Sequence, residues 1–243
     1  MRVSVSGGSN GAFSLRQARF WSITTWLIAI NVAVYVLGIL FPFIDIDKWG
    51  SFSASTALYH GQVWRCITYQ FLHFGPMHLF VNMLGLYFFG PMVERVLGKP
   101  RYLAFYLLCG CCGAAGYLLL WKFGVLVYSA DSSLVGASAA IFGVLVAAAQ
   151  IDPHSIVRVF GMFSMRLRTM VLCFLGLAVL VVLQHGANAG GEASHLGGAA
   201  AGWLLMRNRR WLNIVDRSRR GRQRFWRPGD PAENFFRRDA HRG

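Results

Sequence analysis

The segment Val135-Gly-Ala-Ser-Ala-Ala-Ile-Phe-Gly143 places one hydroxyl group, that of Ser138, among small and apolar residues. A polar side chain in a hydrocarbon environment is costly, so it usually has a hydrogen-bonding partner or a chemical task. A candidate partner, His195, lies in a second small-residue segment, Ser194-His-Leu-Gly-Gly-Ala-Ala-Ala-Gly202. A serine and a histidine that each open an apolar segment suggest a nucleophile and its general base.

The composition of the chain indicates a membrane protein. Of its 243 residues 55% are hydrophobic and 14% are charged, whereas soluble domains carry about 25% charged residues. Residues 1–18 are polar and rich in Gly and Ser, without the pattern of a cleaved signal peptide. The five cysteines do not show the paired spacing of a zinc site. We therefore expect no metal ion and no organic cofactor.

A helix that crosses a bilayer needs about 20 apolar residues. The candidate spans are residues 21–41, 77–97, 102–121, 133–150, 168–184 and 193–206. We therefore expect an all-α membrane protein with a six-helix bundle over residues 19–206. A cytoplasmic N-terminal segment, residues 1–18, would precede it, and a basic cytoplasmic tail without a stable fold, residues 207–243, would follow.

The distribution of basic residues predicts the orientation of these spans. If both termini lie inside, 21 of the 24 Lys and Arg residues fall on cytoplasmic segments, and only Lys48, Arg65 and Lys122 fall on external loops. The net charge of +14 is thus explained by topology and by contact of the tail with anionic lipid, rather than by nucleic acid. The compact six-span form favours a bacterial plasma membrane.

This topology brings three polar residues to a similar depth. The second, fourth and sixth spans all run inward from the outer side, and they carry His78, Ser138 and His195. We expect His78 and His195 to open their spans and Ser138 to lie about one and a half turns into its span, roughly 8 Å inside. Each position also has a purely structural explanation, because membrane helices use Ser hydroxyls to bond back to carbonyls and use Asn and His between helices.

Helical spacing gives these residues their expected partners. His195, Gly198 and Gly202 share one helix face, and its glycines allow close approach to another helix. His78 and Asn82 share a face as well, and both could donate hydrogen bonds to a developing oxyanion. No carboxylate within the spans is placed to complete a Ser-His-Asp triad, and Asp131 and Glu192 are assigned to external loops, so these residues predict a Ser-His dyad.

The same residues carry a resemblance to the rhomboid family of intramembrane serine proteases. Four features over about residues 60–205 match that family: Trp64-Arg65, the His-x4-His-x3-Asn pattern of His73, His78 and Asn82, the Gly-x-Ser motif Gly136-Ala-Ser138, and the His-x2-Gly-x3-Gly motif of His195, Gly198 and Gly202. Each motif is short, but their order and topology agree. The chain departs from the family pattern at Ala139, where glycine is usual, and at Ser194, where alanine is frequent.

The resemblance implies a function and roles for these residues. Ser138 would be the nucleophile and His195 the base, with His78, Asn82 and the Ser138 amide as the oxyanion hole. Phe142 would pack against the catalytic histidine, and His73 would belong to the site or brace its loop. The expected substrates are single-span membrane proteins, cut near the outer face. The sequence does not predict an oligomeric state.

Two other functions remain open at this stage. A rhomboid-fold protein without activity could bind membrane clients, and Ala139 is the feature that favours this alternative. A solute transporter could use the same polar residues as a pathway, but it would more naturally show charged residues in mid-membrane or broken helices in two repeated halves.

Overall fold

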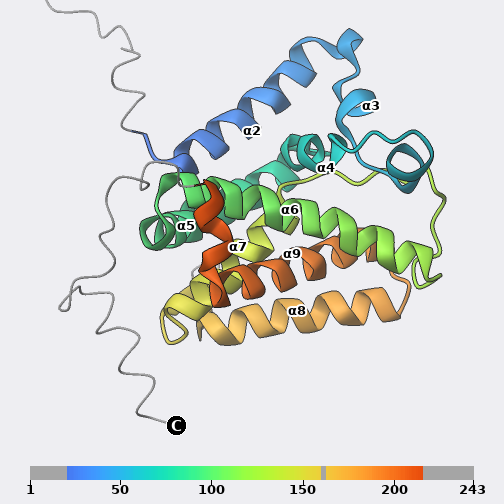
Figure 1. Ribbon diagram of the computed structural model, residues 1–243. Coiled ribbons are helices and arrows are strands. Elements are labelled where there is room, and N and C mark those ends of the chain that lie inside the picture. The colour runs from blue at the N-terminus through green and yellow to red at the C-terminus, as the bar shows by residue number, and fades with distance from the viewer. Residues whose placement is uncertain (1–20, 160–162, 216–243) are drawn as a thin grey trace, which may run out of the picture.

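The structure, a computed structural model, describes residues 21–159 and 163–215. Its longest elements are α2 (Ile23–Leu40), α5 (Pro76–Leu97), α6 (Lys99–Lys122), α7 (Ser138–Ile151), α8 (Leu167–Leu183) and α9 (Ala189–Arg207) (Figure 1). The short helical elements are η1 (Pro42–Ile44), α3 (Ile46–Gly50), η2 (Ser55–Tyr59), α4 (Arg65–Thr68), η3 (Tyr69–Phe71) and η4 (Arg209–Val215). Two short strands, β1 (Ile156–Val159) and β2 (Phe163–Arg166), complete the list.

Each of the six predicted spans coincides with one of the longer helices. Three of them, α2, α5 and α6, are long and apolar enough to cross a membrane, with mean hydropathies of 2.1, 1.2 and 1.9. The helices α7 and α8 are apolar but shorter. Local sequence explains the boundaries of α5, because Pro76 occupies its first turn and Gly98 follows its last residue with φ +79°.

Helix α9 packs against α6, α7 and α8, as Figure 1 shows. Small residues make this possible because the backbones approach closely. A methyl group added at Gly202 would lie 2.6 Å from the Cα of Gly143 in α7, and one added at Gly197 would lie 2.5 Å from the carbonyl oxygen of Cys112 in α6. The glycines of α9 therefore allow the tight contacts expected from the sequence.

Helix α2 is held mainly at its N-terminal end and slants away from the bundle (Figure 1). The carboxylate of Glu94 in α5 accepts hydrogen bonds from the amides of Ile23, at 2.8 Å, and Thr24, at 3.0 Å, and from the Thr24 hydroxyl at 2.8 Å. These bonds satisfy amides of the first turn that have no carbonyl partner within the helix. Beyond this anchor most side chains of α2 are exposed and would face lipid.

Residues 41–75 form a folded loop of short helices rather than a flexible connection. The buried guanidinium of Arg65 donates to the carbonyl oxygens of Ser51 and, at 2.7 Å, Lys48. The Tyr69 hydroxyl donates to the carbonyl oxygen of Gly110 in α6 at 2.6 Å. These bonds fix the loop to the bundle and provide a support for the segment that leads into α7.

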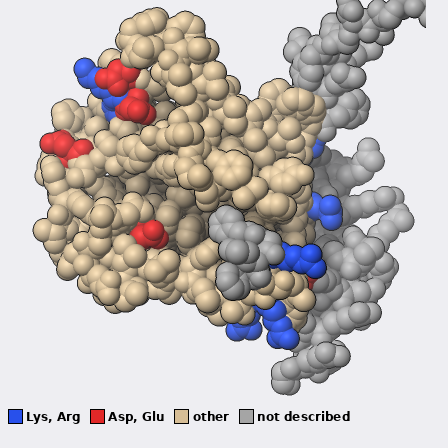
Figure 2. Space-filling model, turned by 180° about the vertical axis from the view of Figure 1, so that it is seen from behind, with Lys and Arg blue, Asp and Glu red and all other residues tan. Residues whose placement is uncertain are grey.

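Charged residues separate between the two ends of the molecule. On the face that Figure 2 shows, most of the visible Lys and Arg side chains lie at one end, and most of the visible Asp and Glu side chains lie toward the other, where a basic side chain also lies. The carboxylates of Asp45, Asp47, Asp131 and Glu192 lie in the α2–α5 loop, the α6–α7 loop and the first turn of α9. The described part of the chain therefore shows the charge asymmetry from which the orientation was predicted.

The prediction of an all-α fold was wrong for the α7–α8 connection. Strands β1 and β2 pair antiparallel there, with Ile156 opposite Arg166 and Val157 opposite Met165. The Ile-Val-Arg-Val sequence suits a strand, since β-branched residues favour that conformation. This hairpin was overlooked because it lies next to longer apolar helices that dominate the sequence pattern.

The two terminal segments lie largely outside the described residues. The predicted N-terminal segment, residues 1–18, and residues 216–243 of the predicted tail are not described. The first part of the tail is described and differs from the prediction, because Arg209–Val215 form the short helix η4, in which Leu212 is fully buried.

Candidate active site

Ser138 is the first residue of α7, and backbone hydrogen bonds hold the chain that leads into it. The amide of Phe52 donates to Leu134 at 3.0 Å, and the amide of Gly136 donates to the carbonyl oxygen of Tyr69 at 2.9 Å. The expected depth of one and a half turns inside a helix was therefore wrong. Instead, Ser138 lies where the first amides of a helix have no intrahelical carbonyl partner.

Gly136 adopts a conformation that only glycine accepts readily. Its φ is +128°, and an added methyl group would lie 2.9 Å from the imidazole ring of His78. The same methyl group would lie 3.5 Å from the hydroxyl oxygen of Ser138. Gly136 thus keeps open the space between the Ser138 hydroxyl and the His78 ring.

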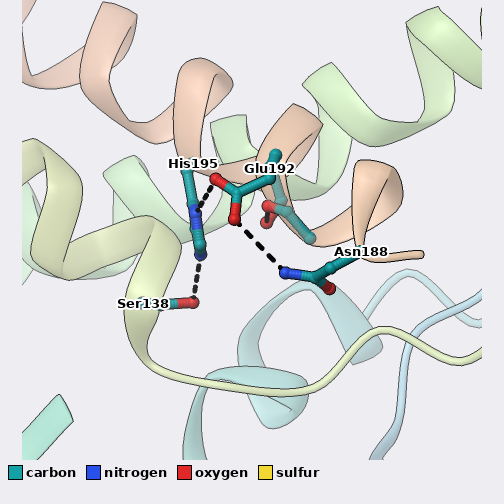
Figure 3. A network of polar contacts seen from close by, with 6 residues as sticks. Ser138, Asn188, Glu192 and His195 are labelled. Atoms are coloured by element: carbon teal, nitrogen blue, oxygen red, sulfur yellow. Dashed lines mark hydrogen bonds and ion pairs between the residues drawn. The ribbon is translucent and has the colours of Figure 1, made fainter. Parts of the chain in front are cut away.

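The side chains of Ser138 and His195 are in direct contact. The Nε2 atom of His195 lies 2.7 Å from the Ser138 hydroxyl oxygen (Figure 3). The imidazole stacks on the ring of Phe142, one turn beyond Ser138 on α7, with a centroid distance of 4.3 Å and an interplanar angle of 8°. This contact leaves the ring little freedom to rotate away from Ser138.

Close packing between α9 and α7 places the histidine at this distance. Gly198 contacts the carbonyl oxygen of Ala139 so tightly that no side chain fits, and Gly202 contacts Gly143 in the same way. His195 does not open its helix as expected, since α9 begins at Ala189. The first turn, with Gly190, Gly191 and Glu192, was expected to be part of a loop because residues 184–192 are rich in Gly, Ala and Asn.

The expectation that Glu192 lies in an external loop was also wrong. Glu192 belongs to α9, and its Oε2 atom lies 2.9 Å from the Nδ1 atom of His195. The other carboxylate oxygen, Oε1, accepts a hydrogen bond from the side-chain amide of Asn188 at 3.3 Å. The spacing of Glu192 and His195, three residues apart, would have placed them on one face had the helix start been recognised. Asp131 does lie in a loop, the one between α6 and α7.

His78 and Asn82 lie on α5, beside the start of α7. His78 borders Gly136, and its ring stacks on Phe74 with a centroid distance of 6.2 Å. Asn82 is buried, and its side-chain nitrogen has no hydrogen-bond partner within the described part of the chain. A buried amide donor without a partner is unusual and points to a functional use. Such a donor suits the oxyanion role implied by the resemblance.

His73 precedes α5 and contacts His78 edge to face, with a centroid distance of 5.0 Å. Burial, together with the neighbouring His78, lowers the pKa of His73 to about 4. His73 is therefore neutral at neutral pH and supports the position of the His78 ring without adding charge.

The two departures from the family motifs have structural explanations. The methyl group of Ala139 faces α6, where it is buried against Gly113; a methyl group built on Gly113 would lie 2.5 Å from it. The Ser194 hydroxyl donates to the carbonyl oxygen of Gly191 in the first turn of α9 at 2.7 Å. Both side chains therefore bond or pack within the bundle.

Comparison with known proteins shows which family this arrangement belongs to. The model of the rhomboid domain matches residues 60–209, more than half of the chain. The rhomboid protease AarA of Providencia stuartii is 28% identical over 220 residues, which are 79% of this chain and 76% of the relative. RHOMBOID-like protein 1 of Arabidopsis thaliana is 30% identical over 67% of this chain and 38% of the relative.

A shorter match is more similar in sequence. The rhomboid protease GluP of Bacillus subtilis is 40% identical over 85 residues, which are 35% of this chain and 15% of the relative. For GluP and the Arabidopsis protein, the chain spans less than two thirds of the relative's own length, and a further Bacillus subtilis relative is matched over 60% of its length. The matched domain, with its membrane helices and its paired serine and histidine, shows that this chain belongs to the rhomboid family.

Proposed function

We propose that the protein is an intramembrane serine endopeptidase in which Ser138 is the nucleophile and His195 the general base. The observation that carries this proposal is the distance of 2.7 Å between the Ser138 hydroxyl oxygen and Nε2 of His195. General bases act at such distances from the atom whose proton they remove. The stacked Phe142 ring supports the role, because it restrains the imidazole.

The reaction begins when His195 takes the hydroxyl proton as the Ser138 oxygen attacks a peptide carbonyl. The resulting oxyanion would accept hydrogen bonds from the unpaired side-chain amide of Asn82, from His78 and from the amide of Ser138. His195 then gives the proton to the leaving amine, and an acyl-enzyme remains on Ser138. Water, deprotonated by His195, hydrolyses this ester and restores the serine.

The substrates would be single-span membrane proteins cleaved near the outer face of the bilayer. Six helices would cross the membrane with both termini on the cytoplasmic side, in a bacterial plasma membrane. The support is the charge separation between the two ends of the molecule, since basic residues favour the cytoplasmic side. Ser138 and His195 lie near the helix ends on the less basic side. The basic tail would contact anionic lipid.

The alternative is an inactive client-binding protein. It rested on Ala139, whose methyl group packs against Gly113 in α6. No feature of the described residues favours it over proteolysis.

The test is covalent labelling of the purified full chain in detergent by a fluorophosphonate, which reacts with activated serines. We expect one adduct, located at Ser138 by peptide mass spectrometry, and no adduct in the Ser138→Ala and His195→Ala variants. Ser194→Ala is the matched control, because its hydroxyl bonds to a backbone carbonyl, and it should label normally. Equal labelling of wild type and Ser138→Ala would reject the proposal.

A further inference from the structure

A carboxylate on α9 touches the side of His195 that faces away from Ser138. Figure 3 shows the side chains of Asn188, Glu192, His195 and Ser138 in one line of polar contacts. The consecutive distances are 3.3 Å from Asn188 Nδ2 to Glu192 Oε1, 2.9 Å from Glu192 Oε2 to His195 Nδ1, and 2.7 Å from His195 Nε2 to Ser138 Oγ. These contacts join two helices, because Ser138 comes from α7 and the other three residues lie at the start of α9.

We propose that Glu192 is a positioning residue for His195, so that the site works as a Ser-His-Glu triad rather than as an isolated dyad. The inference rests on the proposed proteolytic function. It extends that function by assigning a residue that the sequence motifs do not contain. Glu192 would act only through His195, without touching the substrate.

The contact with Glu192 fixes the tautomer of His195. An ionised carboxylate only accepts hydrogen bonds, so the contact at 2.9 Å requires the proton to sit on Nδ1. The Nε2 atom then carries a lone pair and accepts the hydrogen bond from the Ser138 hydroxyl. This is the tautomer that a general base needs, and a protonated Nε2 could not take the serine proton.

The negative charge of Glu192 also affects the charge that His195 gains during the reaction. When His195 takes the serine proton, both of its nitrogens carry hydrogen and the ring becomes positive. The negative carboxylate of Glu192 stabilises that imidazolium and hence the transition state that leads to it. Water weakens the effect, because the side chains of His195 and Glu192 remain 13% and 19% exposed. We therefore expect a smaller contribution than that of a fully buried triad carboxylate.

The carboxylate of Glu192 is itself held in place. Its position in the first turn of α9 suits a negative charge, because the helix dipole is positive there. The start of α9 is fixed by Tyr128, whose hydroxyl donates to Gly186 at 2.7 Å and accepts from the amide of Ala189 at 3.2 Å. Asn188 orients the second carboxylate oxygen. Glu192 is thus aligned before substrate binds.

The test compares kcat, KM and pH profiles of wild type and Glu192→Gln for cleavage of a single-span model substrate in liposomes. Glutamine keeps the shape and removes the charge. We expect kcat to fall about 10- to 100-fold, the factor that one charge-assisted hydrogen bond contributes, with KM and the unfolding midpoint unchanged. The acidic limb of the kcat profile should move to lower pH, because the imidazolium loses its negative neighbour. His78 and Ser138, which also face His195, are unchanged in this variant.

Three further variants separate the possible outcomes. Asp131→Asn removes another carboxylate, one that lies in the exposed α6–α7 loop, and should leave kcat and the pH profile as in wild type. Glu192→Asp should recover part of the lost kcat, because it restores the charge. Glu192→Ala should lose at least as much kcat as Glu192→Gln.

Wild-type kcat and an unshifted pH profile in Glu192→Gln, with Ser138→Ala inactive, would overturn the inference and leave the proteolytic function intact. A fall in kcat that only tracks a lower unfolding midpoint would overturn it as well. Equal cleavage by wild type and Ser138→Ala would instead reject the proteolytic function itself.

Discussion

At the scale of single residues, the site depends on how Ser138 is presented. The segment before it is fixed by backbone hydrogen bonds to Phe52 and Tyr69, and the helix begins at the serine itself. The imidazole of His195 is fixed by the stacked Phe142 ring on one face and by Glu192 at Nδ1. The serine-histidine geometry thus comes from restraints on both partners.

The pairing of Ser138 with His195 could be anticipated from sequence, whereas the role of Glu192 could not. The small residues around each polar side chain and the common direction of the two spans favoured their contact. Glu192 was assigned to a loop because Gly190, Gly191 and the Ala and Asn residues before them are typical of a loop. In the structure those glycines belong to α9, where Gly190 lies close to Tyr117.

The first prediction concerns the oxyanion donors. His78→Ala and Asn82→Ala should each lower kcat by about 10²–10³-fold, the usual cost of one lost donor, while other donors remain in place. Asn82 is the sharper case, because its buried amide has no hydrogen-bond partner within the described residues. Steady-state cleavage of a model substrate measures the effect, with thermal unfolding as the folding control. Wild-type kcat in both variants would show that these side chains serve only packing.

The second prediction concerns Ala139. Its methyl group fills space next to Gly113, so Ala139→Gly should leave cleavage unchanged and lower stability by roughly 1 kcal/mol. A rise in kcat would instead mean that the methyl group crowds the substrate. The measurements are kcat and the thermal unfolding midpoint of the same preparation.

At the scale of elements, most helix positions could be predicted from the apolar segments and from the residues that mark their ends. The bounds predicted for α5, residues 77–97, agree with Pro76–Leu97 because proline and glycine mark its ends. The start of α9 and the β1–β2 hairpin were missed, since tertiary packing rather than local hydropathy determines them. The close contact of α9 with α6 and α7 stabilises a small-residue helix that the hydropathy pattern barely shows.

The third prediction tests this contact between helices. In Gly198→Ala the new methyl group would overlap the backbone carbonyl of Ala139, so α9 must shift away from α7. We expect a lower unfolding midpoint and loss of cleavage, since the Ser138–His195 distance would grow. Gly176→Ala in α8 is the matched control, because an added methyl group there meets no atom within 4 Å. Equal behaviour of the two variants would refute the close-packing explanation.

At the scale of the whole molecule, charge and topology determine which side the active site faces. On the face shown in Figure 2, most of the visible Lys and Arg side chains lie at one end of the helix bundle and most of the visible Asp and Glu side chains lie toward the other. The distribution of Lys and Arg along the sequence predicted this separation, because positive residues favour the cytoplasmic side.

The fourth prediction concerns this orientation. In a cysteine-free background, a cysteine at exposed Asn188, before α9, should react with an impermeant reagent added to intact cells. A cysteine at exposed Ser164, in β2, should react only after the membrane is opened. Reaction of the Ser164 position in intact cells would show the opposite orientation. Expression of both variants at the wild-type level is the control for correct insertion.

The most direct test of the central claim is cleavage of a single-span model substrate by the purified full chain in liposomes. Wild type should release a fragment cut near the outer end of the substrate helix. Ser138→Ala and His195→Ala should each abolish that fragment, because members of one catalytic unit lose nearly all activity singly. Their unfolding midpoints should match wild type. Undiminished cleavage by folded Ser138→Ala would contradict the account.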